Sequence, residues 1–596
     1  MATRRRSDRR VTALLHVHPG DGAARSAFDR ERRVAWATAL PVVLEKHGYL
    51  DVASCAAEDA PAAIASGAPA VVVVTRLAPE QWTDELVATL LAGPFAVLCE
   101  RPPAALHAAL GIATAAPAPH EGRLVACAPG FERAVRERAG AAAAKIAGPI
   151  SHPVPIDPAL LWPATGAPIA PDRAAAWNAP GWSAERWSVD AATTVLAEWQ
   201  SGAGGASAAV VRRGRMAATA VELLAYLAQA HSGAPYDGPE HRNWPRTLAA
   251  EAMLLELIDS LHAAAGASRV RVLPWPRDVR WALNVRHDVD RLPARGDLRR
   301  LLARHDAAAT RATLYVRPRH LTADRAFLAR AAVRRLLGHG AGEPPRRPGG
   351  APYLGPGAPA RALRSTLASL GHELALHSEG VWDGGDAEVD AFAAAFGRPP
   401  AGSCSHGAPD CFRFQGAPNV LWADAAGLDY TELILHTHLQ PHRFPALAAD
   451  GTITVLRTLC LPHHESFDRP GSAPPTGAEA ILGRIDLWRR AGGLLQVMSH
   501  PDLNRDELFD FLAQIPREGR LDTTAAAAAD WWRRSHVAGE LELTTDRAGG
   551  LRMWSRRGVE DLALSVLAPD GRERTLDVAL AADEARTMAL EGIGAR

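Results

Sequence analysis

The sequence predicts an α/β protein of several domains, with an α/β barrel between a parallel-sheet domain and a small β module. Three observations lead to this fold class. Apolar, strand-like runs alternate with amphipathic stretches in residues 1–145, and a second series of such runs, from residue 281, ends in His and Asp clusters. Residues 536–596 then alternate polar and apolar positions between Gly and Asp turns. A chain of 596 residues is long enough for about three or four domains.

The first predicted domain covers residues 1–145. Its strand-like runs lie at 11–17, 70–75, 95–100 and 123–128, and its helix-like stretches at 28–46, 79–92 and 103–111. Because these strands are continuous apolar runs separated by helices, they favour a parallel sheet of Rossmann or flavodoxin type that is covered on both faces. No G-x-G-x-x-G motif follows the first strand. The role of this domain stays open among positioning a polymer, binding a nucleotide-sugar and mediating assembly.

The other domain boundaries follow from changes in pattern. Residues 146–280 combine a Pro- and Trp-rich connector with a helical segment, whose clearest helix pattern covers residues 247–266. Residues 281–535 hold the predicted barrel, interrupted by a Gly- and Pro-rich surface insertion. Its strand-like runs lie at 281–290, 312–320, 371–379, 400–407, 427–434, 453–459 and 493–502. The β module, residues 536–596, has strand-like runs at 540–545, 551–554, 562–569 and 574–580.

Composition excludes several classes of function. The 66 Lys+Arg balance the 66 Asp+Glu, so we expect no nucleic-acid partner. Lysine occurs only at Lys46 and Lys145, and the missing Gly-Lys-Ser/Thr excludes a Walker A motif. No apolar stretch reaches about 18 residues, so we predict no membrane span. The scattered single cysteines are typical of a reduced compartment, which favours a cytoplasmic location. The oligomeric state is not predicted.

Two aspartates mark the end of the first barrel strand. Asp288 and Asp290 follow an apolar run in the segment R-H-D-V-D-R. Residues two apart on an extended chain share a face, so both carboxylates can point into one pocket. Two close carboxylates repel each other unless a cation or a proton lies between them. A divalent metal site is one interpretation, and a pair of capping aspartates at a strand–helix junction is the other.

Three histidines end later strands or follow turns. His377 ends G-H-E-L-A-L-H, His406 lies in S-H-G, and His500 follows the apolar run L-L-Q-V-M-S. His372 and His377 are five residues apart and do not share a helix face, which excludes a zincin helix, so we interpret His372 as structural. Three such histidines and an acidic pair after successive strands indicate one polar site at the carboxyl end of a barrel.

Residues 281–535 resemble the polysaccharide deacetylase family, the NodB-like domain of carbohydrate esterase family 4. The resemblance rests on H-D-V-D after a strand, on A-T-L-Y-V and G-H-E-L-A-L-H, and on a late strand that ends in H-P-D, all in the family's order. It implies a deformed (β/α) barrel of NodB-like type and a metal-dependent hydrolase that removes N-acetyl groups from a glycan or sugar precursor. By position, it implies Asp288 as the catalytic base, Asp290 and His377 as metal ligands, and His500 as the general acid.

The chain departs from this family's pattern in three places. Val289 separates two aspartates that are adjacent in the family, and Val381 stands where its second metal-binding histidine is expected. The segment S-H-G around His406 replaces an Arg-Pro motif. His406 is therefore our candidate for the third metal ligand, and Glu379 is the alternative.

We expect a divalent metal held by nitrogen and oxygen, with zinc favoured and nickel or cobalt as alternatives. The ion would polarise the amide carbonyl while Asp288 takes a proton from the attacking water and His500 protonates the leaving amine. Arg413, His436 and His438 are candidates for binding the carbohydrate substrate. Two alternatives stay open: a non-catalytic glycan-binding or assembly protein, and a C–N hydrolase that acts on a non-sugar amide.

Overall fold

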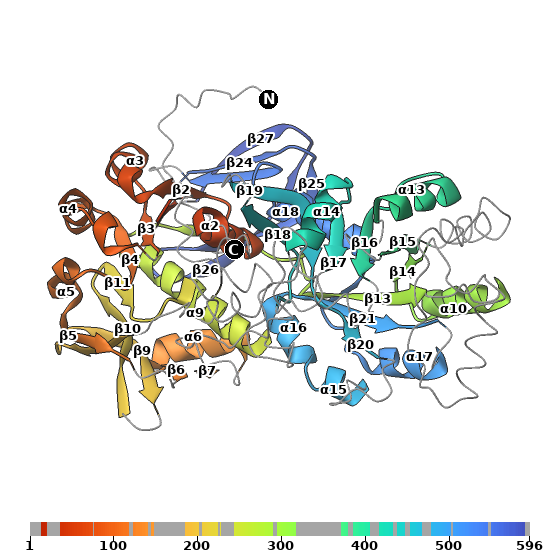
Figure 1. Ribbon diagram of the computed structural model, residues 1–596, viewed down its shortest axis with the longest axis horizontal. Helices are drawn as coiled ribbons and strands as arrows, with labels where there is room; N and C mark the ends of the chain where they lie inside the picture. Colours follow the sequence, from red (N-terminus) through yellow and green to blue (C-terminus); the bar gives the residue numbers. More distant parts are fainter. Residues whose placement is uncertain are drawn as a thin grey trace, which may run out of the picture.

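The apolar runs at the start of the sequence form the parallel strands of a mixed sheet in the computed structural model (Figure 1). A second large sheet is built from the later residues, and two small antiparallel sheets accompany them. No helix in the described part of the chain is long and apolar enough to cross a membrane. The structure describes residues 13–20, 36–75, 77–118, 123–140, 145–147, 185–201, 205–224, 227, 244–289, 295–317, 371–378, 385–405, 417–432, 438–447, 453–467, 478–501, 505–545 and 550–590.

Four parallel strands form one end of the first sheet, in the order β2-β1-β3-β4. All four valines of β3 are buried, as expected for a strand covered on both faces. Parallel pairing is therefore confirmed for the predicted strands at 11–17, 70–75 and 95–100, whereas the run at 123–128 forms a strand that pairs antiparallel with both of its neighbours. The strands are β1 (Leu14–His18), β2 (Val52–Ala56), β3 (Val71–Val74) and β4 (Ala96–Glu100). The helices of this region are α2 (Trp36–Lys46), α3 (Ala60–Gly67), α4 (Asp84–Ala92), α5 (Ala104–Leu110) and α6 (Pro129–Ala139).

The first sheet continues beyond β4 through strands that come later in the chain. The full order is β2-β1-β3-β4-β11-β10-β9-β6-β7, with β5 paired to β8 beside it. These strands are β5 (Ile112–Pro117), β6 (Arg123–Ala126), β7 (Lys145–Ala147), β8 (Glu185–Val189), β9 (Thr194–Ser201), β10 (Gly205–Arg213) and β11 (Met216–Thr219). Residues 185–219, which the sequence analysis assigned to the connector, thus supply four strands of this sheet. Helix α9 (Trp244–Ala264) forms where the helix pattern at 247–266 predicts one.

The second sheet contains most of the predicted barrel strands, and they run parallel. The order is β18-β19-β17-β16-β15-β14-β13-β21-β20, with β22 paired to β13. The strands are β13 (Trp281–Val289), β14 (Ala312–Val316), β15 (Glu373–Ser378), β16 (Gly402–Ser405), β17 (Tyr430–Glu432), β18 (His442–Leu447), β19 (Ile453–Leu461), β20 (Glu465–Ser466), β21 (Leu494–Ser499) and β22 (Arg520–Asp522). The helices are α10 (Arg295–Ala307), α13 (Gly385–Phe396), α14 (Ala417–Ala425), α15 (Ala478–Leu482), α16 (Ile485–Ala491) and α17 (Arg505–Gln514).

The second sheet is curled, and the chain itself shows why. Strand β19 ends at Leu461 and β20 begins at Glu465, so the chain between them spans at most about 14 Å. In the sheet these two strands are seven strand steps apart, which in a flat sheet would separate them by about 34 Å. The sheet must therefore curl until its two ends approach each other. Within the described residues it stays open, because no strand ladder joins β18 or β19 to β20.

A polar layer fills the amino end of this curled sheet. The Tyr430 hydroxyl donates to the Glu373 carboxylate at 2.6 Å, and the Thr313 hydroxyl lies 3.0 Å from the same carboxylate. Helix α18 (Ala525–His536) points its N-terminus into this layer, where the Ala526 amide donates to Glu373 at 2.8 Å. These contacts occupy the amino end of the sheet, and in barrels of parallel strands the functional residues lie at the carboxyl ends.

The final residues form the small antiparallel sheets that the period-two pattern predicts. Strands β23 (Leu541–Thr545), β24 (Gly550–Ser555) and β27 (Glu584–Ala589) make one sheet. Strands β25 (Val559–Leu567) and β26 (Glu573–Leu580) make the other, together with β12 (Arg269–Val272) from the predicted connector. The β module is therefore joined to a strand that lies far earlier in the sequence.

Candidate functional site

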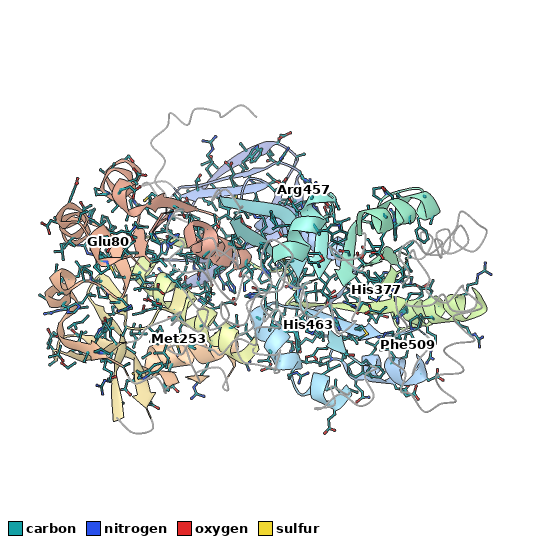
Figure 2. The ribbon with its side chains drawn as sticks, viewed as in Figure 1. Glu80, Met253, His377, Arg457, His463 and Phe509 are labelled. Atoms are coloured by element: carbon teal, nitrogen blue, oxygen red, sulfur yellow. The ribbon has the colours of Figure 1, made fainter. Side chains whose placement is uncertain are left out.

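Polar side chains gather at the carboxyl ends of the strands of the second sheet. Because parallel strands end at the same edge, residues near their ends come together. His377 and His463 both lie in this part of the molecule, whereas Met253 of α9 lies with the first sheet (Figure 2). The residues concerned are Arg286 and Asp288 on β13, His377 on β15, Cys404 on β16, Glu432 on β17, His463 and His464 after β19, and His500 after β21.

Asp288 is held by an arginine from its own strand. Arg286 and Asp288 are two residues apart and share a face, and the guanidinium donates to both carboxylate oxygens, with Nε–Oδ1 at 2.8 Å and Nη2–Oδ2 at 2.5 Å. Burial alone would raise the pKa of Asp288, but the charges of Arg286 and His377 outweigh it and hold this pKa below its ordinary value. The Asp288 carboxylate is therefore ionised at neutral pH.

His377 and Cys404 complete a group around Asp288. They lie directly opposite each other on neighbouring strands, with His377 Nδ1 and Cys404 Sγ 3.1 Å apart. Cys404 Sγ lies 4.0 Å from Asp288 Oδ1, and all three side chains are buried. One donor atom from each residue lies within 4.8 Å of the other two. Three elements thus bring an oxygen, a nitrogen and a sulfur donor to one point.

This donor set fits a divalent ion of the zinc type. Tetrahedral zinc bonds of 2.0–2.3 Å separate neighbouring donor atoms by about 3.3–3.6 Å. The two distances at Cys404, 3.1 and 4.0 Å, lie on either side of that range, so small side-chain movements would satisfy the geometry. The sequence analysis expected only nitrogen and oxygen donors, but this group also contains a thiol, because Cys404 lies beside His377.

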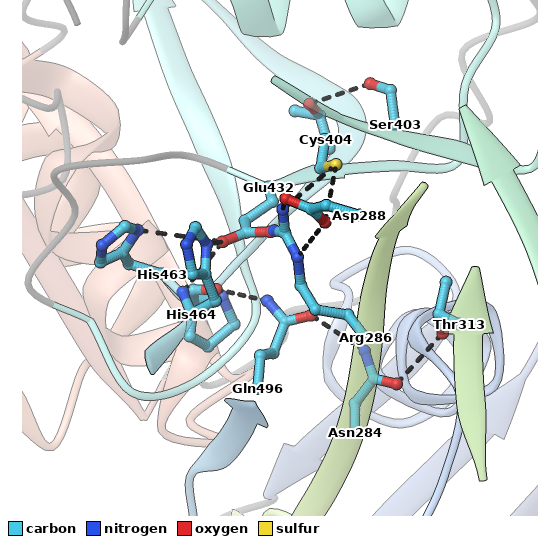
Figure 3. A network of polar contacts seen from close by, with 12 residues as sticks. Asn284, Arg286, Asp288, Thr313, Ser403, Cys404, Glu432, His463, His464 and Gln496 are labelled. Atoms are coloured by element: carbon cyan, nitrogen blue, oxygen red, sulfur yellow. Dashed lines mark hydrogen bonds and ion pairs between the residues drawn. The ribbon is translucent and has the colours of Figure 1, made fainter. Parts of the chain in front are cut away.

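A second group lies on the other side of Arg286. Its guanidinium also forms an ion pair with Glu432 Oε2, so it bridges Asp288 and Glu432 (Figure 3). The other carboxylate oxygen, Glu432 Oε1, accepts from the His464 backbone amide at 2.9 Å and lies 2.6 Å from His464 Nδ1. His463 Nδ1 is 3.8 Å from the same oxygen. Glu432, His463 and His464 therefore form a second buried group with metal-binding donors.

The opposite face of β13 carries structural histidines. His287 Nε2 lies 2.8 Å from His305 Nε2, and His305 Nδ1 lies 2.8 Å from the Thr310 hydroxyl. Burial lowers the pKa of His287 to about 4, so its ring is neutral at pH 7. His372 accepts from the Ala312 amide at 3.1 Å, in agreement with the structural role expected for it. These rings pack the strand rather than serve the site.

The structure brings together only some of the predicted site residues. Asp288 and His377 meet, and His500 directly follows β21, which ends at the same edge of the sheet. His438 lies elsewhere: its Nδ1 is 3.1 Å from Lys46 Nζ and 3.5 Å from Glu251, between the second sheet and helices α2 and α9. The remaining predicted residues, which lie outside the described part of the chain, are Asp290, Glu379, His406, Arg413 and His436.

The sequence analysis missed Arg286, Cys404 and Glu432 as site residues. Arg286 carried a usable signal, because it stands two positions before Asp288 on a strand and must share its face. Cys404 and Glu432 carried no such signal in the sequence, because their roles follow from the strand order β17-β16-β15.

In the comparisons with known proteins, no protein-family model matches the chain, and no curated protein matches it.

Proposed function

We propose that this chain is a metal-dependent hydrolase that removes N-acetyl groups from a glycan or sugar precursor. The observation that supports it best is the buried group of Asp288, His377 and Cys404 at the carboxyl ends of three parallel strands. The resemblance of residues 281–535 to polysaccharide deacetylases supplies the substrate class. The metal would be zinc, with nickel or cobalt as alternatives for the same donors.

Each residue has a task that its surroundings support. His377 and Cys404 would hold the ion, which when bound would supply polarisation of the amide carbonyl. Arg286 fixes the Asp288 carboxylate and keeps it ionised, and the resemblance assigns this carboxylate to accept a proton from the attacking water. His500 follows β21 at the same edge of the sheet, and the resemblance assigns it to protonate the leaving amine, because an amine cannot depart as an anion.

The proposal is tested by metal content and acetate release together. Protein purified without a His tag is stripped of metal, loaded with zinc and incubated with N-acetylglucosamine oligomers. We expect zinc-dependent acetate release from the wild type and a loss of zinc affinity in Cys404→Ser. Cys460→Ser is the matched control, because Cys460 is equally buried on β19 but belongs to neither donor group. Equal zinc affinity in both variants would contradict the proposed ligand set.

Asp288→Asn separates two roles for this carboxylate. If Asp288 is the base, the variant keeps its zinc and loses acetate release; if Asp288 is a ligand, it loses both. Acetate release from simple acetamides but not from sugars would favour the non-sugar C–N hydrolase. Zinc binding without any hydrolysis would favour the non-catalytic glycan-binding protein.

A further inference from the structure

We infer that Glu432, His463 and His464 form a second divalent-metal site, separate from the site of the proposed hydrolase. The inference does not depend on the proposed function. It rests on the group beside the segment that joins the two ends of the curled sheet, where β17 supplies the carboxylate and the short segment between β19 and β20 supplies both rings. Two imidazoles and one carboxylate are a donor set of catalytic zinc sites, in which three protein ligands leave a position open.

The positions of the donor atoms suit a single ion. Glu432 Oε1 is the common point, 2.6 Å from His464 Nδ1 and 3.8 Å from His463 Nδ1. These distances lie on either side of the about 3.3 Å that separates nitrogen and oxygen donors in a tetrahedral zinc site. The two rings lie against each other with centroids 4.5 Å apart and tilted by 47°. Both Nδ1 atoms lie near Oε1, so small side-chain movements would bring the three donors to the spacing of a zinc site.

Arg286 gives the Glu432 carboxylate the fixed orientation that a ligand needs. Its guanidinium pairs with Oε2, so Oε1 is the oxygen turned toward the histidines (Figure 3). The His464 backbone amide fixes that same oxygen at 2.9 Å. Hydrogen-bonding partners that orient a ligand contribute about 10- to 100-fold to metal affinity. The side chains of both acids that Arg286 joins are at most 8% exposed, so water competes little for either site.

A purely structural role makes a different prediction. In that case Glu432 serves only to accept the His464 amide and to fix the segment that joins the two ends of the sheet. Removing the charge of Glu432 would then leave the number of bound metal ions unchanged. The two readings therefore differ in metal stoichiometry rather than in folding or activity.

Cobalt titration distinguishes the two groups by their ligands. Metal-free protein is titrated with Co²⁺ alone, and binding is followed by equilibrium dialysis and absorption spectra. We expect two ions per chain. Only the ion at His377 and Cys404 has a thiolate ligand, so only that ion gives sulfur-to-cobalt charge-transfer absorption. In Cys404→Ser this absorption should disappear while the Glu432 site still binds one ion.

Substitutions in the second group should have the opposite effect. Glu432→Gln and His463→Gln should each weaken binding of the second ion by more than about 100-fold. Loss of a ligand reduces metal affinity more than loss of a residue that only orients the ligand. The charge-transfer absorption should remain. Glu373→Gln is the matched control, because Glu373 is a buried acid of the same sheet that contacts no histidine of either group. Circular dichroism checks that each variant is folded.

Each outcome decides between the two sites. One Co²⁺ per chain with charge-transfer absorption, or two ions that persist in both Glu432→Gln and His463→Gln, would overturn the second site and leave the proposed hydrolase intact. One Co²⁺ without charge-transfer absorption that is lost in Glu432→Gln would support the second site. That last result would count against the ligand set of the proposed hydrolase.

Discussion

Arg286→Met should be among the most destabilising substitutions in the second sheet. The Arg286 side chain is 1% exposed and pairs with two carboxylates, Asp288 at 8% and Glu432 at 0% exposure. Removing one partner of a buried ion pair costs about 3–5 kcal/mol, because the other charge is left without compensation. Here two buried carboxylates lose the same partner, so we expect a loss near the upper end, about 5 kcal/mol.

The loss should also depend on pH. In the variant, burial acts on Asp288 without the opposing guanidinium, and burial raises the pKa of this carboxyl. A group whose pKa is higher in the folded state than in the unfolded state favours folding at low pH, and this contribution is lost as the pH rises through the folded pKa. The difference in stability between wild type and Arg286→Met should therefore be larger at pH 8 than at pH 5.

Hydrogen exchange measures the loss of stability at β13 itself. A chain with several sheets need not unfold in one step, so the opening free energy of the amides of β13, residues 281–289, is a better measure than one midpoint. Adding Asp288→Asn and Glu432→Gln to Arg286→Met should recover most of the loss, since no uncompensated carboxylate then remains. A loss below about 1 kcal/mol, or one that these additions leave unchanged, would refute the reasoning.

Three further substitutions test the surrounding fold. Thr83→Ala should weaken α4 by about 1 kcal/mol in hydrogen exchange, because the Thr83 hydroxyl accepts from the Leu86 amide at 3.2 Å; the exposed Thr89→Ala is the control. Gly48→Ala should cost at least about 2 kcal/mol in urea unfolding, because Gly48 has φ +80° and an added Cβ would overlap the Val272 backbone, whereas Gly67→Ala meets open space. Burial lowers the pKa of His262 from 6.5 to about 4, so its contribution to stability is complete above pH 6.5 and is lost as the pH falls toward 4. His262→Gln should flatten that loss by up to about 1.4 kcal/mol per pH unit in the opening free energy of the α9 amides, measured by hydrogen exchange, and an unchanged slope would contradict this pKa.

The strands were predictable where burial leaves a simple pattern. Each of the four valines of β3 is buried, so the apolar run in the sequence and the strand coincide. The same holds for β13, where Asp288 follows seven residues of a fully buried strand. The parallel sheet and the strand-end positions of Asp288, His377 and His500 followed from such runs.

Sheet order was not predictable, because the sequence pattern of a strand does not identify its neighbours. Cys404 becomes a candidate ligand only because β16 lies beside β15 with Cys404 opposite His377. Residues 185–219 join the first sheet for the same kind of reason, since β11 pairs with β4. His438 was a candidate for substrate binding, but it contacts Lys46, and that contact depends on how α2 packs against the second sheet.

The position of β13 in its sheet has a consequence for synthesis of the protein. One side of β13 pairs with β14, but the other side pairs with β21, where Ala282 meets Leu494. These partners are 212 residues apart (494 − 282), which takes about 10–40 s at ribosomal speeds of about 5–20 residues per second. Throughout that time the nascent chain carries an uncovered apolar strand edge, which is a hazard for aggregation. The strand that holds Asp288 is therefore among the first parts of its sheet to be made and among the last to be covered, so this chain should depend on chaperones that bind during translation.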